Sequence, residues 1–335
     1  MELTITYDLR APDFGANRNA LYAAALEQAV WADELGFDVI GLGEHHSAAD
    51  GYNPSSLVVA SAMAARTRSI KLRTSVLLAP LYDLAKLAED AAVTQIVSNG
   101  RLLLGIGAGY RPSEFETFGR KLEDRWRVMG ETCEFLRRAW TGEEFEWQGR
   151  RCLVTPAPEP FAPPILLGGS SAAAARRAAR IADGWFPPLD PRLWQPYRQE
   201  CVALGKADPG EYPSHGPIFL WVTRDPEQAW RQLMPHIQHQ LQSYSEWTTE
   251  AFGRPAGPYA GEMTAETVRK SPAYKVLTPE QTLELAHQLG DHSVLYLNPL
   301  LAGIDPALSW EMLSLYEREV HPYLRRDVGS GALSP

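Results

Sequence analysis

Basic residues, cysteines and long apolar runs are all scarce in this 335-residue chain. Lys and Arg number 32 against 41 Asp and Glu, and the resulting net charge of −9 makes a nucleic-acid partner unexpected. Three cysteines cannot build a disulfide framework, which favours a reducing, cytoplasmic setting. No apolar run approaches the length of about 18 residues that a membrane span needs, and no leader-like segment opens the chain. We therefore expect neither a membrane span nor a signal peptide.

Short apolar runs alternate with amphipathic stretches along most of the sequence. Strands are expected at 3–7, 37–42, 70–78, 101–106, 165–167, 184–186, 217–222 and 293–297, and helices at 19–35, 54–67, 84–97, 123–140, 172–182, 191–204, 279–289 and 307–325. This α/β alternation predicts a (β/α)₈ TIM barrel with insertions, and a doubly wound open sheet is the alternative. Short strands without a polar face favour the barrel, because barrel strands are buried on both faces.

Three segments depart from the strand–helix pattern. Residues 144–155 alternate around a Gln-Gly turn and predict an inserted hairpin. Residues 235–275 are polar with little regular period, which favours a loop that acts as a lid. Residues 327–335 are small and polar and are expected to form a flexible tail. With these insertions, residues 1–326 are interpreted as a single domain.

The densest cluster of reactive side chains is Glu44-His45-His46, which directly follows the second predicted strand. Catalytic groups of such barrels lie at the carboxyl ends of the strands, and imidazole can act as an acid or a base near neutral pH. A surface loop with paired histidines is the other reading. Adjacent side chains point in opposite directions and no third ligand is evident, so no metal site is predicted.

Two glycine-rich turns follow later strands. Gly107-Ala108-Gly109-Tyr110 ends the fourth strand, either to let a ligand approach the backbone or to fit the barrel's curvature. It lacks the full dinucleotide fingerprint. Gly168-Gly169-Ser170-Ser171 opens a helix, where N–H groups and hydroxyls suit a phosphate, although a serine N-cap explains it equally.

Other candidates are weaker. His236 and His239, three residues apart in the predicted lid, are expected on a solvated helix face. His46 and four aromatic residues on predicted strands are candidates for the substrate pocket, with packing in the core as the alternative for the aromatics. These four are Trp185, Phe219, Trp221 and Tyr296.

Together, these motifs resemble the bacterial luciferase-like family of flavin-dependent oxidoreductases. The resemblance is carried by GFDVIGLGEHH (36–46), GYNPSSLVVASAMAARTRSIKLRTSVLLAP (51–80), GRLLLGIGAGYRPSEFETFG (100–119) and PPILLGGSSAAAARRAARIADGWF (163–186). It is strong over residues 1–190 and looser beyond them.

The resemblance implies a barrel that binds reduced FMN at its mouth, with His45 as the catalytic histidine and Glu44 as a flavin-proximal carboxylate that also serves catalysis. It places the flavin ring on a bulge in the third strand at Ser75 and Val76, where the family often has a non-proline cis peptide. The remaining cofactor contacts implied by the resemblance are Gly107, Ala108, Gly109, Tyr110, Arg125, Gly168, Gly169, Ser170 and Ser171.

The same resemblance implies a monooxygenase that uses reduced FMN and O₂, through a C4a-peroxyflavin, on a small organic substrate. The resemblance also implies a separate flavin reductase as a partner and the assembly of the chain into a homodimer. Gly107-Ala108 and Gly169 replace a Cys-Arg pair and a Glu of the luciferase subunit, so light emission is not implied. Gly-Ala-Gly-Tyr also occurs in relatives that use the deazaflavin coenzyme F-420, which makes an F-420-dependent dehydrogenase or reductase the alternative. A non-catalytic flavin-binding subunit is a third reading, and the presence of Glu44-His45 speaks against it.

Overall fold

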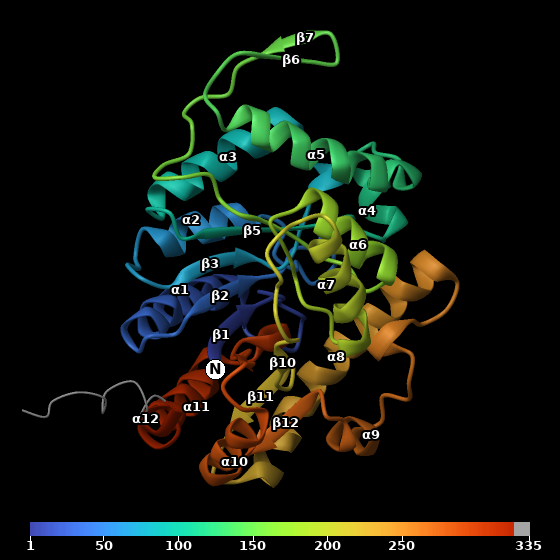
Figure 1. The fold of residues 1–335 in the computed structure, drawn as a ribbon. Helices are drawn as coiled ribbons and strands as arrows, with labels where there is room; N and C mark the ends of the chain where they lie inside the picture. Colours follow the sequence, from blue (N-terminus) through green and yellow to red (C-terminus); the bar gives the residue numbers. More distant parts are fainter. Residues whose placement is uncertain (325–335) are drawn as a thin grey trace, which may run out of the picture.

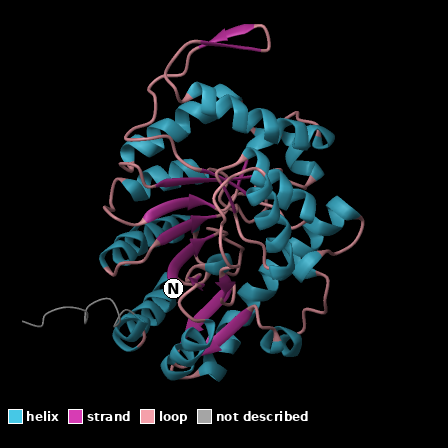
Figure 2. Ribbon diagram, viewed as in Figure 1, coloured by secondary structure: helices cyan, strands magenta, loops and turns pink. Residues whose placement is uncertain are grey.

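The computed structural model describes residues 1–324, and helices surround a mostly parallel sheet (Figure 1 and Figure 2). The main strands are β1 (Glu2–Tyr7), β2 (Val39–Leu42), β3 (Lys71–Thr74), β4 (Leu77–Leu78), β5 (Leu102–Gly107), β8 (Ile165–Leu167), β9 (Gly184–Trp185), β10 (Ser214–His215), β11 (Phe219–Val222), β12 (Tyr274–Leu277) and β13 (Ser293–Leu297). Hydrogen bonds join them in the order β10-β13-β1-β2-β3-β5-β8-β9, with β4 also on β5 and with β11 and β12 as a separate pair.

The helices are α1 (Arg18–Glu34), α2 (Ser56–Ala64), α3 (Leu84–Val97), α4 (Pro112–Thr117), α5 (Arg125–Ala139), α6 (Ala172–Ile181), α7 (Trp194–Ala203), α8 (Pro226–Phe252), α9 (Ala265–Lys270), α10 (Pro279–Leu289), α11 (Pro306–Glu319) and α12 (His321–Leu324). Single 3₁₀ turns occupy Ala79–Leu81, Leu122–Asp124, Pro191–Leu193, Gly257–Tyr259 and Leu301–Gly303. Side-chain caps fix several helix starts: Asn17 accepts from the N–H of Ala20, and Thr278 forms a capping box with Gln281.

The order of the strands confirms the predicted TIM-barrel class. From β13 through β1, β2, β3, β5 and β8 to β9, the strands follow one another around the sheet in chain order, and β11 packs against β13. Among the described strands, no hydrogen-bonded ladder closes the ring between β9 and β11.

Most predicted elements occur within a few residues of their expected bounds, and residues 84–97, 279–289 and 293–297 match their predictions. The predicted hairpin is the antiparallel pair β6 (Phe145–Trp147) and β7 (Arg150–Cys152), which projects from the body of the molecule (Figure 1).

Two predictions need correction. The strand expected at 70–78 is divided into β3 and β4, although the Ser75–Val76 peptide between them is cis, as the resemblance implied. The segment 235–275 is not mainly a loop, because α8 continues to Phe252 through the internal Pro235. The tail predicted at 327–335 lies outside the described residues.

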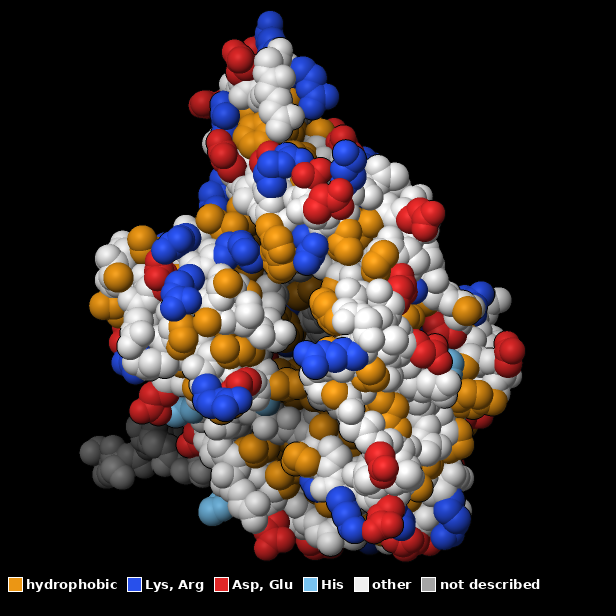
Figure 3. Space-filling model, turned by 90° about the vertical axis from the view of Figure 1, so that its right-hand side faces the viewer, with side chains coloured by type: hydrophobic (Ala, Val, Ile, Leu, Met, Phe, Trp, Pro, Cys, Tyr) orange, Lys and Arg blue, Asp and Glu red, His pale blue; other side chains and the backbone are white. Residues whose placement is uncertain are grey.

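The two faces of the barrel strands differ in exposure. Thr6, Leu103, Leu166 and Tyr296 are each half-exposed, whereas the residues before and after each of them are buried against the helices. Successive side chains of a strand point to opposite faces, so these four point inward and solvent reaches the barrel interior. Figure 3 looks onto the side of α4, α6 and α8 and shows a hollow there, rimmed by apolar and basic side chains.

The alternate glycines of β5 accommodate the turn between β3 and β4. A Cβ on Gly107 would lie 2.5 Å from Val76 Cγ2, and one on Gly168 would lie 3.1 Å from Val76 Cγ1. A Cβ on Gly105 would lie 2.1 Å from the carbonyl oxygen of Thr74. The Gly-x-Gly spacing of β5 is therefore a packing requirement of this turn.

Gly105→Ala should destabilise the protein by about 2 kcal/mol or more, because its Cβ meets a backbone oxygen that cannot rotate away. Gly130→Ala is the matched control: Gly130 lies within α5, a Cβ added there would have no neighbour within 4 Å, and the change should stabilise by up to about 1 kcal/mol. Urea unfolding measures both changes. Equal stability of the two variants would contradict the packing role of Gly105.

Candidate active site

The Glu44 carboxylate is a buried junction between three segments. Its Oε2 accepts from the N–H (3.2 Å) and hydroxyl (2.6 Å) of Ser56 and from the Tyr82 hydroxyl (3.0 Å). Its Oε1 accepts from the N–H of Leu78, at 3.0 Å. Glu44 is 2% exposed, so these bonds hold the end of β2 against the start of α2 and against β4, which follows the Ser75–Val76 turn.

His45 is oriented by a carboxylate that sequence reasoning missed. Its Nδ1 lies 2.9 Å from Oε1 of Glu114, a fully buried residue of α4. A carboxylate oxygen only accepts, so Nδ1 donates and Nε2 becomes the nitrogen through which His45 can exchange a proton. The same Oε1 accepts from the N–H of His46, at 2.9 Å. Glu114 Oε2 is buried without a hydrogen-bond partner among the described residues.

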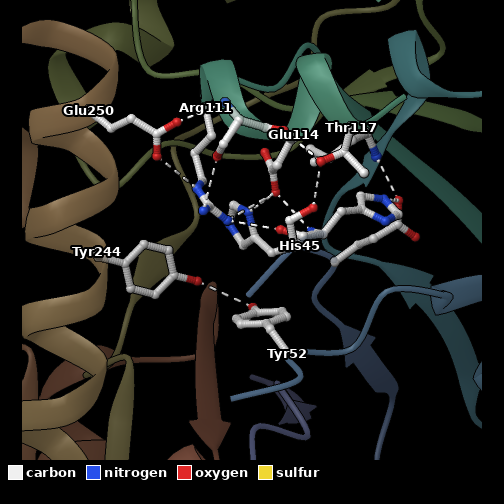
Figure 4. A network of polar contacts seen from close by, with 12 residues as sticks. His45, Tyr52, Arg111, Glu114, Thr117, Tyr244 and Glu250 are labelled. Atoms are coloured by element: carbon white, nitrogen blue, oxygen red, sulfur yellow. Dashed lines mark hydrogen bonds and ion pairs between the residues drawn. The ribbon is translucent and has the colours of Figure 1, made fainter. Parts of the chain in front are cut away.

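Arg111 joins this cluster to α8 (Figure 4). Its Nη1 donates to the carbonyl of His46 at 2.9 Å, and its Nε lies 3.5 Å from Oε2 of Glu250. The guanidinium also lies 4.4 Å from the ring centre of Trp247. Because Arg111 is 5% exposed and held by these groups, it is not a free cation at the mouth.

Aromatic rings surround His45. The ring centres of Tyr52, Tyr244 and Trp247 lie 5.0, 5.8 and 4.6 Å from the His45 ring centre. Tyr110 lies 5.9 Å away and stacks on Phe252 of α8. The cage therefore combines residues that follow β2 and β5 with the second half of α8, and it limits access of water to His45.

A buried ion cluster attaches α8 to the barrel below this cage. Arg10 is 1% exposed and donates from Nε to Asp50 Oδ2 at 2.5 Å, and His239 donates to the same oxygen at 2.7 Å. His236 bonds the carbonyl of Ala302. The prediction that His236 and His239 occupy a solvated helix face is therefore wrong, because both face the barrel.

Asp8 and Asp50 carry opposite pKa shifts beside Arg10. Burial raises the pKa of Asp8 to about 6, although the charge of Arg10 and the N–H groups of Arg10 and Ala302 oppose the rise. Burial also acts to raise the pKa of Asp50, but the hydrogen bond from His239 and the charge of Arg10 prevail and lower it to about 2.

The residues predicted to hold a flavin lie on neighbouring strands at the mouth. Ser75, Val76, Gly109 and Tyr110 are half-exposed, and Ala108 is buried. The backbone of Gly109 has φ +69°, and a Cβ there would lie 3.0 Å from the Phe115 ring.

The predicted phosphate loop opens α6. Ser171 is its N-cap and accepts from the N–H of Ala174, so the capping interpretation holds for this serine, while Ser170 is exposed. Arg125, the first residue of α5, lies 4.9 Å from the ring centre of Trp126, and Arg177 of α6 lies 4.2 Å from the same ring. Two cations thus flank one indole beside α6.

Three of the four aromatic candidates for the substrate pocket are core residues, which was the alternative interpretation. Trp185 is buried and stacks on Trp194 of α7, because it points outward from β9. Phe219 and Trp221 are at most 2% exposed within the helix-side core. His46 packs on Phe118.

Of the four aromatic candidates, only Tyr296 points into the barrel, where it is half-exposed and bonds His215. The signal missed in the sequence was Glu114, which lies in the quoted stretch 100–119 just after the glycines.

The chain thus combines a TIM-barrel-class fold with a buried histidine–carboxylate pair and glycine-lined turns at one barrel mouth. The chain belongs to the luciferase-like monooxygenase family, whose model matches residues 8–295.

Individual relatives include both oxygenases and F420-dependent enzymes. The oxygenase component of the flavin-dependent trigonelline monooxygenase of Acinetobacter baylyi is 32% identical over 43% of this chain and 41% of its own length. An F420-dependent glucose-6-phosphate dehydrogenase of Rhodococcus erythropolis is 23% identical over 97% of this chain and 98% of its own. The chain spans 32% to 56% of the lengths of the curated relatives that it matches first.

A solved structure shares the fold. The oxygenating constituent of 3,6-diketocamphane monooxygenase from Pseudomonas putida, in complex with FMN, has a TM-score of 0.71 and 21% identity, covering 96% of this chain and 98% of that one. Within residues 1–324, no helix is long and apolar enough to cross a membrane, and no three His, Cys, Asp or Glu side chains cluster as metal ligands.

Asp8→Asn should change how stability depends on pH. The folded-state pKa of Asp8, about 6, exceeds the ordinary 3.8, so the folded protein binds the extra proton between these values. The contribution of Asp8 to the free energy of unfolding is therefore fully present below about pH 4. It falls by about 2–3 kcal/mol as the pH rises through 6. Denaturant unfolding from pH 4 to 7 should show this fall in the parent and not in the variant, and parallel profiles would refute it.

Proposed function

We propose that this chain is the oxygenase component of a flavin-dependent monooxygenase that uses reduced FMN and O₂ on a small organic substrate. The observation that favours FMN over coenzyme F-420 is the state of Arg111, which is buried and donates to the His46 carbonyl and the Ser113 hydroxyl. A polyanionic tail would need free cations at the mouth. A monophosphate needs only N–H groups, hydroxyls and a nearby guanidinium.

The residues at the mouth fit a flavin. The half-exposed Ser75–Val76 turn would support one face of the ring, and the backbone of 107–110 continues from β5 beside it. Ser170, the free N–H groups at the start of α6 and the cations Arg125 and Arg177 would receive the phosphate. When bound, the reduced flavin supplies the activation of O₂.

The chain's own contribution is to hold a proton and exclude water. Glu114 orders His45 with Nδ1 protonated, so His45 Nε2 can accept or return a proton at the reacting group. The cage of Tyr52, Tyr244 and Trp247 surrounds the imidazole and keeps bulk solvent from it. Glu44 acts as a positioning residue, because its oxygens are occupied by Ser56, Tyr82 and the Leu78 N–H.

Partners follow from the same assignment. An oxygenase component requires reduced flavin from a separate reductase, as the names of two relatives imply for those proteins. A cytoplasmic location, one domain over 1–326 and the homodimer stay predictions. Exposed Val58 on α2 and Val93, Ile96 and Val97 on α3 provide an apolar surface for a second copy.

The second candidate is an F-420-dependent dehydrogenase or reductase, in which His45 would serve as acid or base beside a hydride transfer. It is favoured by the full-length similarity to an F420-dependent dehydrogenase. Titration of the purified protein separates the two: reduced FMN, and not reduced F-420, should bind with a Kd in the micromolar range. Tight binding of F-420 with none of FMN would sink the monooxygenase assignment.

His45→Ala should lower turnover by about 100-fold or more while FMN affinity is mostly kept, because the proton carrier is lost but no ring contact is. Glu114→Gln should lower turnover about tenfold, since the amide no longer fixes the orientation and the protonated Nδ1 of the imidazole. Glu116→Gln, exposed on the same helix, is the control. Reductase-coupled assays measure all three, and unchanged turnover in His45→Ala would refute its role.

A further inference from the structure

The barrel interior holds a cation that the assigned flavin site does not use. Arg73 lies on β3, two residues before Ser75 and therefore on the same inward face. The parallel register places Gly41 beside it on β2 and Leu103 beside it on β5, and Gly41 pairs in turn with Thr6 on β1. Arg73 thus stands in one inward row of four strands, just below the turn assigned to the flavin.

The buried guanidinium of Arg73 has few hydrogen-bond acceptors and one distant carboxylate to balance its charge. Its side chain is 9% exposed, and its carboxylate partner is Glu2, whose Oε1 lies 3.5 Å from Nη1 and whose side chain is 36% exposed. The Nε and Nη2 atoms are buried without a hydrogen-bond partner among the described residues. An unmet donor on a buried charged group is costly, so this arrangement is suited to receive an acceptor.

Aromatic and neutral polar groups surround this cation. The Phe186 ring centre lies 4.7 Å from the guanidinium carbon. The hydroxyl of Tyr296 lies 2.9 Å from Nδ1 of His215, whose Nε2 is also buried without a partner among the described residues. Burial, followed by the charge of Arg73, lowers the pKa of His215 to about 4, so this histidine is neutral at pH 7. Arg73 is therefore the only positive charge among these residues.

Solvent reaches the barrel interior beside the cluster. Thr6, Leu103 and Tyr296 are half-exposed there. Phe186 and His215 are likewise half-exposed. The hollow in Figure 3 opens on the same side of the molecule as α4, α6 and α8.

We propose that this interior cluster is the substrate's anion subsite, in which Arg73 holds the carboxylate of a flat organic acid whose body lies against Phe186 and Tyr296. The inference deepens the proposed function, on which it rests, by naming the substrate class. The carboxylate would supply the acceptors that the guanidinium lacks, and a bidentate pair would orient the organic body toward the Ser75–Val76 turn.

The alternative is that Arg73 only closes the barrel floor together with Glu2. A 3.5 Å contact to a partly exposed carboxylate is a weak pair, and it leaves Nε and Nη2 unused. A purely structural arginine would show no preference between charged and neutral ligands of one shape. This difference is the basis of the test.

Calorimetric titration with benzoate and with benzamide, on the protein without flavin and on the FMN-loaded protein, tests the proposal. Benzoate should bind at least tenfold more tightly than benzamide. Arg73→Met should abolish that preference with benzamide binding unchanged, whereas Arg73→Lys should keep part of it. Arg176→Met, on the exposed side of α6, is the control that retains the full preference. Thermal melting checks that each variant is folded. If Arg73→Met does not fold, a reduced preference for benzoate in Arg73→Lys tests the proposal instead.

Equal affinity for the two probes, no binding of either, or a preference that survives in Arg73→Met would overturn the proposal. A loss of affinity for reduced FMN in Arg73→Met, with the benzoate preference kept, would assign Arg73 to the flavin instead. Failure of the parent protein to bind FMN would refute the monooxygenase assignment and not this subsite, because the flavin-free titration stands independently.

Discussion

The site depends on one buried carboxylate, that of Glu44. Four donors from three residues, Ser56, Leu78 and Tyr82, converge on its two oxygens, and each would otherwise be unmet in the interior. These bonds fix the loop after β2 relative to the Ser75–Val76 turn. His45 and His46 follow Glu44 directly, so the bonds of Glu44 also fix the position of their backbone. Glu114 then determines the orientation of the His45 ring.

A second layer of the site comes from α8. Arg111 contacts Trp247 and Glu250, and Asp50 accepts from both Arg10 and His239, so the helix is tied to the barrel at two levels. The helix therefore completes the cage around His45. His45, the aromatic cage and α8 are thus connected to one another through Arg111 and Asp50.

Much of this architecture could be predicted from the sequence. The hydrophobic period and the turn residues located most strands and helices. The mouth of the barrel was located by three motifs that follow predicted strands: Glu44-His45, the β5 glycines and the serines before α6. Those signals are local. The break at Ser75–Val76 followed from the family resemblance alone, since no residue in that stretch disrupts a strand pattern.

The remainder depends on tertiary contacts, which a single sequence does not display. Glu114 orients a histidine that lies 69 positions earlier in the chain, and Asp50 binds a histidine that lies 189 positions later. Pro235 within α8 obscured the helical period, so the segment looked irregular. Trp185, Phe219 and Trp221 were misplaced because a short apolar strand gives no sign of which of its faces points inward.

The central claim is that the mouth binds a flavin against the Ser75–Val76 turn with its phosphate at the start of α6. A crystal structure of the protein soaked with FMN tests it most directly. We expect the ring on Ser75 and Val76, within reach of His45, and the phosphate at Ser170 and Ser171. A flavin bound elsewhere, or a mouth that stays empty at saturating FMN, would contradict the claim.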